Sequence, residues 1–325
     1  MSTFDPPTSR ATLRDLRLIT DHGGLSGADL FRGELLNGTR VVVKRSTHGR
    51  DVFQRLLGHA ESLELALWSD GVFDRLPRGV SSPTIGGWVD GTDTWIVMRD
   101  LDGFVVGPDH AFDESEVERL LASLTALHSS GIRPNATTPL DRVVGMFSRT
   151  RLDAVDAPAA LKASVARGWS LFRELGGSAL ADRVVPLADD PSPLVSALAA
   201  RPAGFCHGDV AGVNMAWDGD GVALLDWGQA FIGPPALDIA RFLPSGLRTS
   251  VVANDELLAA YQSRRGAEFD GVGLELSLLA AFVWYGWQKA IDASETADLA
   301  LKRAELEGIR WWCERLPRAL AHLHD

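Results

Sequence analysis

Short runs of apolar residues, separated by turn residues, occupy the first third of the chain and are typical of β-strands. They lie at 16–20, 30–36 and 40–45, and Asn37-Gly38 separates the last two. Asn-Gly between apolar segments is the strongest short-range hairpin signal, because both residues tolerate a positive φ. The first third is therefore predicted to begin as an antiparallel sheet.

The pattern then changes between helix and strand. In 51–69, apolar residues recur among polar ones at a spacing that favours one amphipathic helix. A second β region is expected at 94–98, after an Asp-Gly turn signal at 90–91, and a connector at 99–103. From Asp113 onwards leucines and valines fall on one helical face, so the rest is predicted to be mainly helical.

One short β pattern interrupts this helical part. Two apolar segments, 213–217 and 222–225, flank the loop 218–221, so the sequence predicts a hairpin with a four-residue loop. Folding about the middle of that loop pairs positions 214 and 225. Asn214 and Asp226 are therefore expected side by side at the open end of the hairpin.

Three polar residues around this hairpin carry the most specific chemical signal. A carboxylate from Asp226 and an amide oxygen from Asn214 form a site for a hard cation that prefers oxygen ligands, and Mg²⁺ on a nucleotide fits. Asp209 lies on the loop that enters the hairpin, close enough to act beside that metal.

Length and charge bound the kinds of protein this chain can be. With 325 residues it is long enough for two lobes with separate cores. Apolar residues make up 46% and charged residues 23%, which is ordinary globular composition. The net charge of −11 opposes binding to nucleic acid phosphates and favours a cationic small-molecule partner.

The remaining composition signals concern location. The first ten residues carry no apolar run after a basic start, so they do not resemble a secretory signal. The longest apolar stretch, 276–287, is far shorter than the roughly 20 residues that a membrane span needs. Cys206 and Cys313 lack disulfide or zinc-site spacing and are expected to be reduced. We expect a cytoplasmic protein that binds no membrane, as a monomer or homodimer.

The HGD motif at 207–209, followed by Asn214, resembles the catalytic loop of the kinase fold in its aminoglycoside phosphotransferase and choline kinase branch. Gly208 stands in place of the usual arginine, and the DWG motif at 226–228 stands where protein kinases have DFG. The resemblance implies an α+β, bilobal, protein-kinase-like fold, with an antiparallel β-sheet N-lobe carrying one main helix and a mostly helical C-lobe.

The same resemblance implies a role for each of these residues. Asp209 would be the catalytic base, Asn214 and Asp226 would be magnesium ligands, and His207 would brace the loop. Asp238, in the Gly-Pro…Asp-Ile-Ala pattern that follows, resembles the family residue that buttresses the catalytic loop.

A Gly-rich loop lies upstream, in the order that the kinase fold requires. Gly23, Gly24, Ser26 and Gly27 separate the first two predicted strands and look like the GGxS-type loop of the phosphotransferase branch. Glycines allow close backbone approach and leave N–H groups available for phosphate.

The lysine that such a site requires is Lys44, which ends a Val-Val-Val-Lys run resembling the VAIK strand. By resemblance it holds the α and β phosphates and pairs with a carboxylate on the following helix. Glu64 is our choice for that partner, and Glu61, one turn earlier, is the competitor. Met98, Asp100 and Leu101 are expected at the hinge, whose main chain would bind adenine.

These inferences predict an ATP- and Mg²⁺-dependent phosphotransferase that phosphorylates a hydroxyl of an aminoglycoside-like antibiotic, a sugar or an amino alcohol. The predicted domains are a nucleotide-binding lobe at 1–98, a hinge at 99–103, and a helical lobe with the catalytic loop and acceptor site at 104–325. A role in antibiotic resistance follows from the family resemblance alone. Five aromatic residues of the C-terminal helices are candidates to contact an acceptor, although their helical spacing favours a place in the core: Trp284, Tyr285, Trp287, Trp311 and Trp312.

Two other functions stay open. A protein Ser/Thr kinase is disfavoured because Gly208 replaces arginine and no APE-like element follows Asp226. A non-catalytic nucleotide-binding pseudokinase is disfavoured because Lys44, Asp209 and Asn214 are all present along with Asp226.

Overall fold

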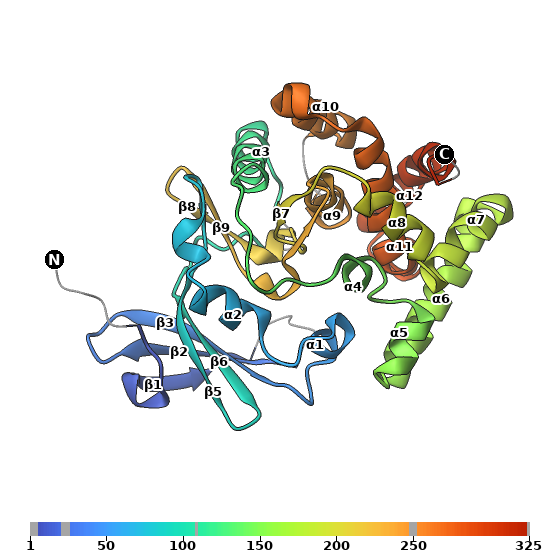
Figure 1. Ribbon diagram of the computed structural model, residues 1–325. Helices are drawn as coiled ribbons and strands as arrows, with labels where there is room; N and C mark the ends of the chain where they lie inside the picture. Colours follow the sequence, from blue (N-terminus) through green and yellow to red (C-terminus); the bar gives the residue numbers. More distant parts are fainter. Residues whose placement is uncertain (1–5, 21–26, 108–109, 247–251, 324–325) are drawn as a thin grey trace.

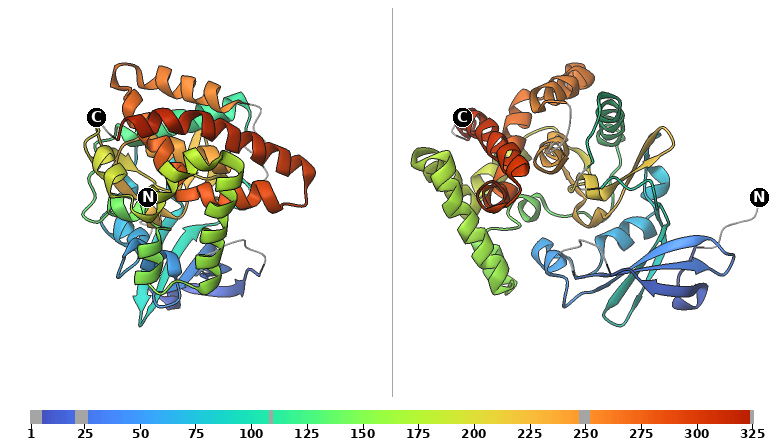
Figure 2. Two further views of the ribbon diagram at one scale, coloured as in Figure 1. Left: turned by 90° about the vertical axis from the view of Figure 1, so that its right-hand side faces the viewer. Right: turned by 180° about the vertical axis from the view of Figure 1, so that it is seen from behind.

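A sheet-rich N-terminal part packs against a larger helical part, as the expected α+β, bilobal fold requires (Figure 1). The structure is a computed structural model and describes residues 6–20, 27–107, 110–246 and 252–323. Two further views place helix α12 (red, Leu299–Ala321) and the N-terminal sheet (blue) at opposite ends of the molecule (Figure 2).

Five antiparallel strands form the N-terminal sheet in the order β1-β2-β3-β6-β5. Their bounds are β1 Leu13–Leu18, β2 Asp29–Leu35, β3 Arg40–Thr47, β5 Thr84–Asp90 and β6 Asp93–Arg99. Side chains alternate across a strand, so Val41 and Val43 enter a small apolar cluster on one face while Lys44 occupies the other. The alternation therefore presents Lys44 to the side of the sheet that carries helix α2 (Leu63–Ser69).

Strand β5 is the part of this sheet that the sequence pattern does not predict. Its segment contains Gly86-Gly87, and glycine weakens a strand pattern because it has no side chain to pack. In the structure a Cβ at Gly87 would overlap the side chain of Leu65 in α2. The glycine therefore lets the helix approach the strand closely.

The single helix predicted at 51–69 is wrong: the structure has two helices there, α1 (Val52–Leu57) and α2. Gly58 adopts the left-handed conformation, with φ of 78°, and ends α1. Ser62 then caps α2, because its hydroxyl accepts a hydrogen bond from the backbone N–H of Leu65 at 3.3 Å. The apolar periodicity continues across this break, which is why the pattern alone suggests one helix.

The helical part is built around α11 (Gly271–Glu295), whose residues are buried over most of its length. None of the described helices is long and apolar enough to cross a membrane. Besides α11 and α12, the helices of this part are α3 Glu114–His128, α4 Leu140–Val144, α5 Arg149–Ala154, α6 Ala159–Gly176, α7 Ser178–Asp189, α8 Ser192–Ala199, α9 Ala236–Gly246 and α10 Asn254–Arg265.

Two small sheets flank the catalytic loop, and one of them joins the lobes. Strands β8 (Met215–Asp218) and β9 (Gly221–Leu224) form the predicted hairpin, and β4 (Val80–Ser81) from the N-terminal part pairs in parallel with β9. Strands β7 (Gly204–Cys206) and β10 (Phe231–Gly233) pair antiparallel.

The hairpin has the predicted register, but its loop is shorter than predicted. The backbone N–H of Leu225 donates to the Asn214 carbonyl at 2.9 Å, as the predicted pairing of positions 214 and 225 requires. Asp218 and Gly221 pair with each other, so the loop has two residues instead of four. The ladder extends further because the turn needs only the two residues between them.

Candidate active site

A buried aspartate, Asp238 at the start of α9, holds the loop that carries Asp209. Its Oδ2 accepts from the backbone N–H of His207 at 2.9 Å, and its Oδ1 accepts from the backbone N–H of Gly208 at 2.8 Å. The Nε2 of His128 lies 2.9 Å from the same Oδ2. Burial alone would raise the pKa of Asp238, but its hydrogen bonds and the neighbouring histidines outweigh burial and lower it. The carboxylate thus fixes two consecutive peptide groups immediately before Asp209.

The imidazole of His207 is fully buried and links this loop to the hairpin. Its Nε2 donates to the Leu225 carbonyl at 2.9 Å, so its Nδ1 carries no proton and accepts from the Asp209 N–H at 3.3 Å. The ring packs edge-on against Trp227, with centroids 4.7 Å apart. Burial lowers the pKa of His207, which favours the neutral form that these two bonds need.

Gly208, between these two residues, occupies a position that only glycine fits. Its φ is +88°, in the left-handed region that side chains disfavour. A Cβ would also overlap the backbone carbonyl of Gln229, which follows the DWG motif. The close approach of two backbones accounts for glycine at this point of the loop.

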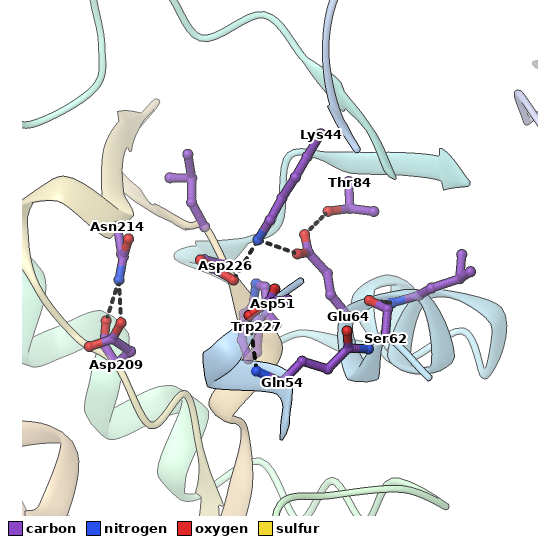
Figure 3. Close-up of polar contacts among 12 residues, drawn as sticks. Lys44, Asp51, Gln54, Ser62, Glu64, Thr84, Asp209, Asn214, Asp226 and Trp227 are labelled. Atoms are coloured by element: carbon purple, nitrogen blue, oxygen red, sulfur yellow. Dashed lines mark hydrogen bonds and ion pairs between the residues drawn. The ribbon is translucent and has the colours of Figure 1, made fainter. Parts of the chain in front are cut away.

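Asp209 and Asn214 face each other across the short 3-10 turn Gly212–Asn214. The Asn214 Nδ2 donates to the Asp209 Oδ2 at 2.8 Å and to the Asp209 carbonyl at 3.0 Å (Figure 3). Both amide protons point to Asp209, so the amide oxygen of Asn214 is directed elsewhere.

Lys44 from the N-terminal sheet meets two carboxylates in Figure 3. Its Nζ lies 2.9 Å from the Asp226 Oδ1 and 4.0 Å from the Glu64 Oε2. Thr84 donates to the other oxygen of Glu64 at 2.7 Å. Burial alone would lower the pKa of Lys44, but the two carboxylates outweigh it and raise it. Glu61, the competing partner, is exposed.

A cleft of about 340 Å³ lies between the lobes. Its walls include five predicted site residues: Lys44, Glu64, Asp209, Asn214 and Asp226. Three of the lining acids come from the segment after β9, the catalytic loop and α2, so segments far apart in the sequence converge there.

Sequence reasoning missed Asp51, another acid of this cleft. Asp51 caps α1 by accepting from the Gln54 N–H at 3.0 Å, and burial raises the pKa of its carboxyl group. An aspartate directly before a helix is a capping signal that the sequence contains. Its place beside Lys44 depends on how α1 packs.

Arg241 was also missed, whereas Tyr285 was named among the aromatic candidates. The Arg241 Nη2 lies 2.6 Å from the Asp209 Oδ1 and donates to the Tyr285 hydroxyl at 2.7 Å. A signal existed, because Arg241 lies three positions after Asp238 in one helix, a spacing that places both side chains on one face.

The aromatic residues of the C-terminal helices divide between core and cleft. Trp284, Trp287 and Trp312 are buried, as their spacing suggests. Tyr285 lines the cleft.

Several predicted nucleotide-binding residues cannot be placed in the cleft. Gly23, Gly24 and Ser26 lie outside the described residues, and Gly27 lies two positions before β2 with φ of +73°.

The predicted hinge residues do not line the cleft. Met98 is buried in β6, which continues through Arg99, one residue into the predicted hinge. The Asp100 carboxylate is almost fully buried and lies 3.6 Å from Arg32. Met98, Asp100 and Leu101 are not among the described residues that line the cleft.

Comparison with known proteins gives the family. A model described as the phosphotransferase enzyme family, APH, matches residues 23–275, well over half of the 325 residues. No curated protein sequence matches the chain.

Solved structures share the fold at low sequence identity. A choline/ethanolamine kinase family protein from Mesorhizobium loti is 17% identical over 97% of this chain and 94% of its own, with a TM-score of 0.52. The aminoglycoside phosphotransferase APH(3'')-Id from Streptomyces rimosus, solved with ADP and streptomycin, is 18% identical over 81% and 94%, with a TM-score of 0.50. A thermostable mutant of APH(4)-Ia, solved with AMP-PNP and hygromycin B, is 14% identical over 95% of each chain, with a TM-score of 0.50.

At these identities the likenesses establish the protein-kinase-like fold alone. The family match shows more than the fold, because it spans the segments that bring Lys44, Asp209 and Asp226 into one cleft. This protein therefore belongs to the phosphotransferase enzyme family.

Proposed function

We propose that this phosphotransferase uses ATP and Mg²⁺ to phosphorylate a hydroxyl group of a small molecule. The observation that carries the proposal is the convergence of Lys44, Asp209, Asn214 and Asp226 in one cleft between the lobes. Phosphoryl transfer depends mainly on in-line positioning and on neutralising charge, and these four groups supply both.

Asn214 and Asp226 fit the magnesium site in the chemistry of their donor atoms. The Asn214 amide nitrogen is committed to Asp209, which leaves the amide oxygen for a cation. Asp226 pairs with Lys44 through Oδ1, and its side chain is 47% exposed. Bound Mg²⁺ would balance the charge of the phosphate oxygens; hard carboxylate and amide oxygens are the ligands it prefers.

Nucleotide binding is assigned to the N-terminal lobe, residues 1–98, and its junction at 99–103. Lys44 is the phosphate-binding lysine, and Glu64 orients it. The Gly23–Gly27 loop would contribute backbone N–H groups, and the main chain of Met98, Asp100 and Leu101 would contact adenine. Two similar structures were solved with adenine nucleotides, ADP and AMP-PNP, which supports ATP as the donor.

Asp209 is the proposed catalytic base, and the C-terminal lobe, 104–325, is the proposed acceptor side. Asp209 would orient the acceptor hydroxyl and take its proton during transfer. His207 and Asp238 support this role, because Asp238 accepts from the backbone N–H groups of His207 and Gly208 and the His207 ring accepts from the N–H of Asp209.

The acceptor is proposed to be an aminoglycoside-like antibiotic, a sugar or an amino alcohol. Streptomycin and hygromycin B are bound in similar structures, and another similar protein belongs to the choline/ethanolamine kinase family. A cytoplasmic location, a monomeric or homodimeric state and a resistance role stay predictions from sequence.

The direct test measures ADP release with Mg²⁺ and ATP across aminoglycosides, simple sugars, choline and a generic protein. We expect turnover that depends on one small acceptor, whereas a phosphorylated protein product would indicate a protein kinase.

The variant Asp209→Ala tests the base. Transfer should fall by roughly 10²–10⁴-fold, the usual contribution of a general base, while nucleotide binding persists. Asp220→Ala, at the exposed hairpin turn, serves as the control. Transfer by Asp209→Ala at the wild-type rate would contradict the assignment.

A further inference from the structure

Arg241 is a buried arginine that the proposed roles above do not use. It projects from α9 into the cleft, and its side chain is 8% exposed. Removing a guanidinium group from water is costly unless the charge is paired and hydrogen-bonded. A buried arginine beside a proposed catalytic base must therefore have partners that pair with its charge and accept its hydrogen bonds.

Tyr285 of α11 forms that environment together with Asp209. The Arg241 guanidinium carbon lies 3.8 Å from the centroid of the Tyr285 ring, close enough for a cation–π interaction. Its Nη2 also donates to the Tyr285 hydroxyl at 2.7 Å. Ring and hydroxyl together limit how the guanidinium can move.

The result is that each oxygen of Asp209 has its own partner. Arg241 lies 2.6 Å from Oδ1, and the Asn214 amide donates to Oδ2 at 2.8 Å. A carboxylate held at only one oxygen can rotate about its last bond, whereas one held at both cannot. Each oxygen keeps a second lone pair for a hydroxyl proton.

We propose that Arg241 is a positioning residue for Asp209 and that Tyr285 fixes Arg241. The inference rests on the proposed function, in which Asp209 is the base. Arg241 acts through Asp209 and belongs to the acceptor side of the cleft, so it should affect turnover and leave nucleotide affinity unchanged.

The test compares four variants: Arg241→Gln, Arg241→Lys, Tyr285→Phe and Arg315→Gln. Arg315 is a matched control, because it pairs with Asp255 and lies 4.1 Å from the Trp311 ring centroid, away from the cleft. The measurements are the dissociation constant of Mg–ATP, the melting temperature, and kcat and KM for ATP hydrolysis with water as acceptor. Any acceptor found by ADP release is then measured in the same way.

We expect Arg241→Gln to lower kcat by about 10²-fold, the usual cost of misplacing a catalytic group, with Mg–ATP affinity unchanged. Arg241→Lys should recover part of the loss because it restores a cation. Tyr285→Phe should lower kcat less than Arg241→Gln does, and Arg315→Gln should have the kcat of the wild type. Wild-type kcat in Arg241→Gln, or a parallel loss of affinity and melting temperature, would overturn the inference.

Crystal structures of the wild type and Arg241→Gln separate this inference from the proposed function. If the wild type neither binds nor hydrolyses ATP, the proposed function fails. The inference is then decided by the Asp209 carboxylate: a rotated group in Arg241→Gln supports it, and an unchanged group overturns it.

Discussion

Gly208 shows how one residue shapes the catalytic loop. Its peptide N–H donates to Asp238, and a Cβ added to its α carbon would overlap the backbone carbonyl of Gln229. Any side chain here meets a backbone carbonyl that cannot move without displacing the DWG segment.

We therefore expect Gly208→Ala to destabilise the protein and to abolish most transfer. The left-handed backbone alone costs about 1–3 kcal/mol for a residue with a side chain, and the overlap with Gln229 adds to it. Urea unfolding and ADP-release assays measure the two effects.

Gly131→Ala is the matched control. Its φ is +69°, but nothing lies within 4 Å of the added Cβ. The additional loss of stability in Gly208→Ala measures the cost of the overlap with the Gln229 backbone. Equal losses of stability in the two variants would contradict this explanation.

At the scale of elements, the break between α1 and α2 places Glu64 opposite Lys44. Ser62 caps the start of α2, so Glu64 lies in the first turn of this helix. The Glu64 carboxylate accepts a hydrogen bond from the Thr84 hydroxyl of β5. A continuous helix through 51–69 would have no N-terminus at Ser62 and so would not place Glu64 in a first turn.

Ser62→Ala should therefore weaken both stability and nucleotide binding. Loss of a serine cap costs about 1 kcal/mol, and fraying of the first turn displaces Glu64 from Lys44, which should raise KM for ATP. Thermal unfolding and initial-rate kinetics provide the measurements.

Ser148→Ala provides the comparison, because Ser148 caps α5 with the same 3.3 Å bond to a backbone N–H. Both variants should lose similar stability, but only Ser62→Ala should change KM. A raised KM in both would mean that the kinetic effect is general.

At the scale of the molecule, the two lobes meet through Lys44 and Asp226, which are 182 positions apart. A ligand that contacts both lobes should stabilise their arrangement. We expect Mg²⁺ with ADP to raise the melting temperature more than ADP alone, because a ligand that binds more tightly stabilises the folded state more. A ligand at about 100-fold its Kd stabilises by about 2.7 kcal/mol.

Asp226→Asn should remove the magnesium-dependent part of this increase and keep part of the magnesium-free response. Asp218→Asn is the control from the same hairpin, where the carboxylate binds Ser81 and Arg99 instead. A full magnesium response in Asp226→Asn would argue against Asp226 as a metal ligand.

Local signals in the sequence predicted the parts of the site whose geometry is local. The register that pairs positions 214 and 225 follows from the strand period and a short turn, and the structure has that register. The motifs that contain Lys44, Asp209 and Asp226 likewise indicated the fold, because each motif is a contiguous stretch and the three follow one another in the family's order.

Contacts between distant segments could not be predicted in the same way. Strand β5 escapes the pattern because its glycines fit close contacts with other segments: Pro7 at Gly86, and Trp95 of β6 and Leu65 of α2 at Gly87. The contact between Arg241 and Tyr285 escapes because Tyr285 lies on a helix 44 positions away, and no spacing rule links the two.

The sequence by itself thus determined which chemical groups this phosphotransferase carries and how the hairpin pairs, since both depend on neighbours along the chain. Only the tertiary structure decided that Lys44 reaches Asp226 and that Arg241 reaches Asp209. The physical reason is that such contacts arise from the packing of α9, α11 and the two lobes, where burial selects partners irrespective of sequence distance.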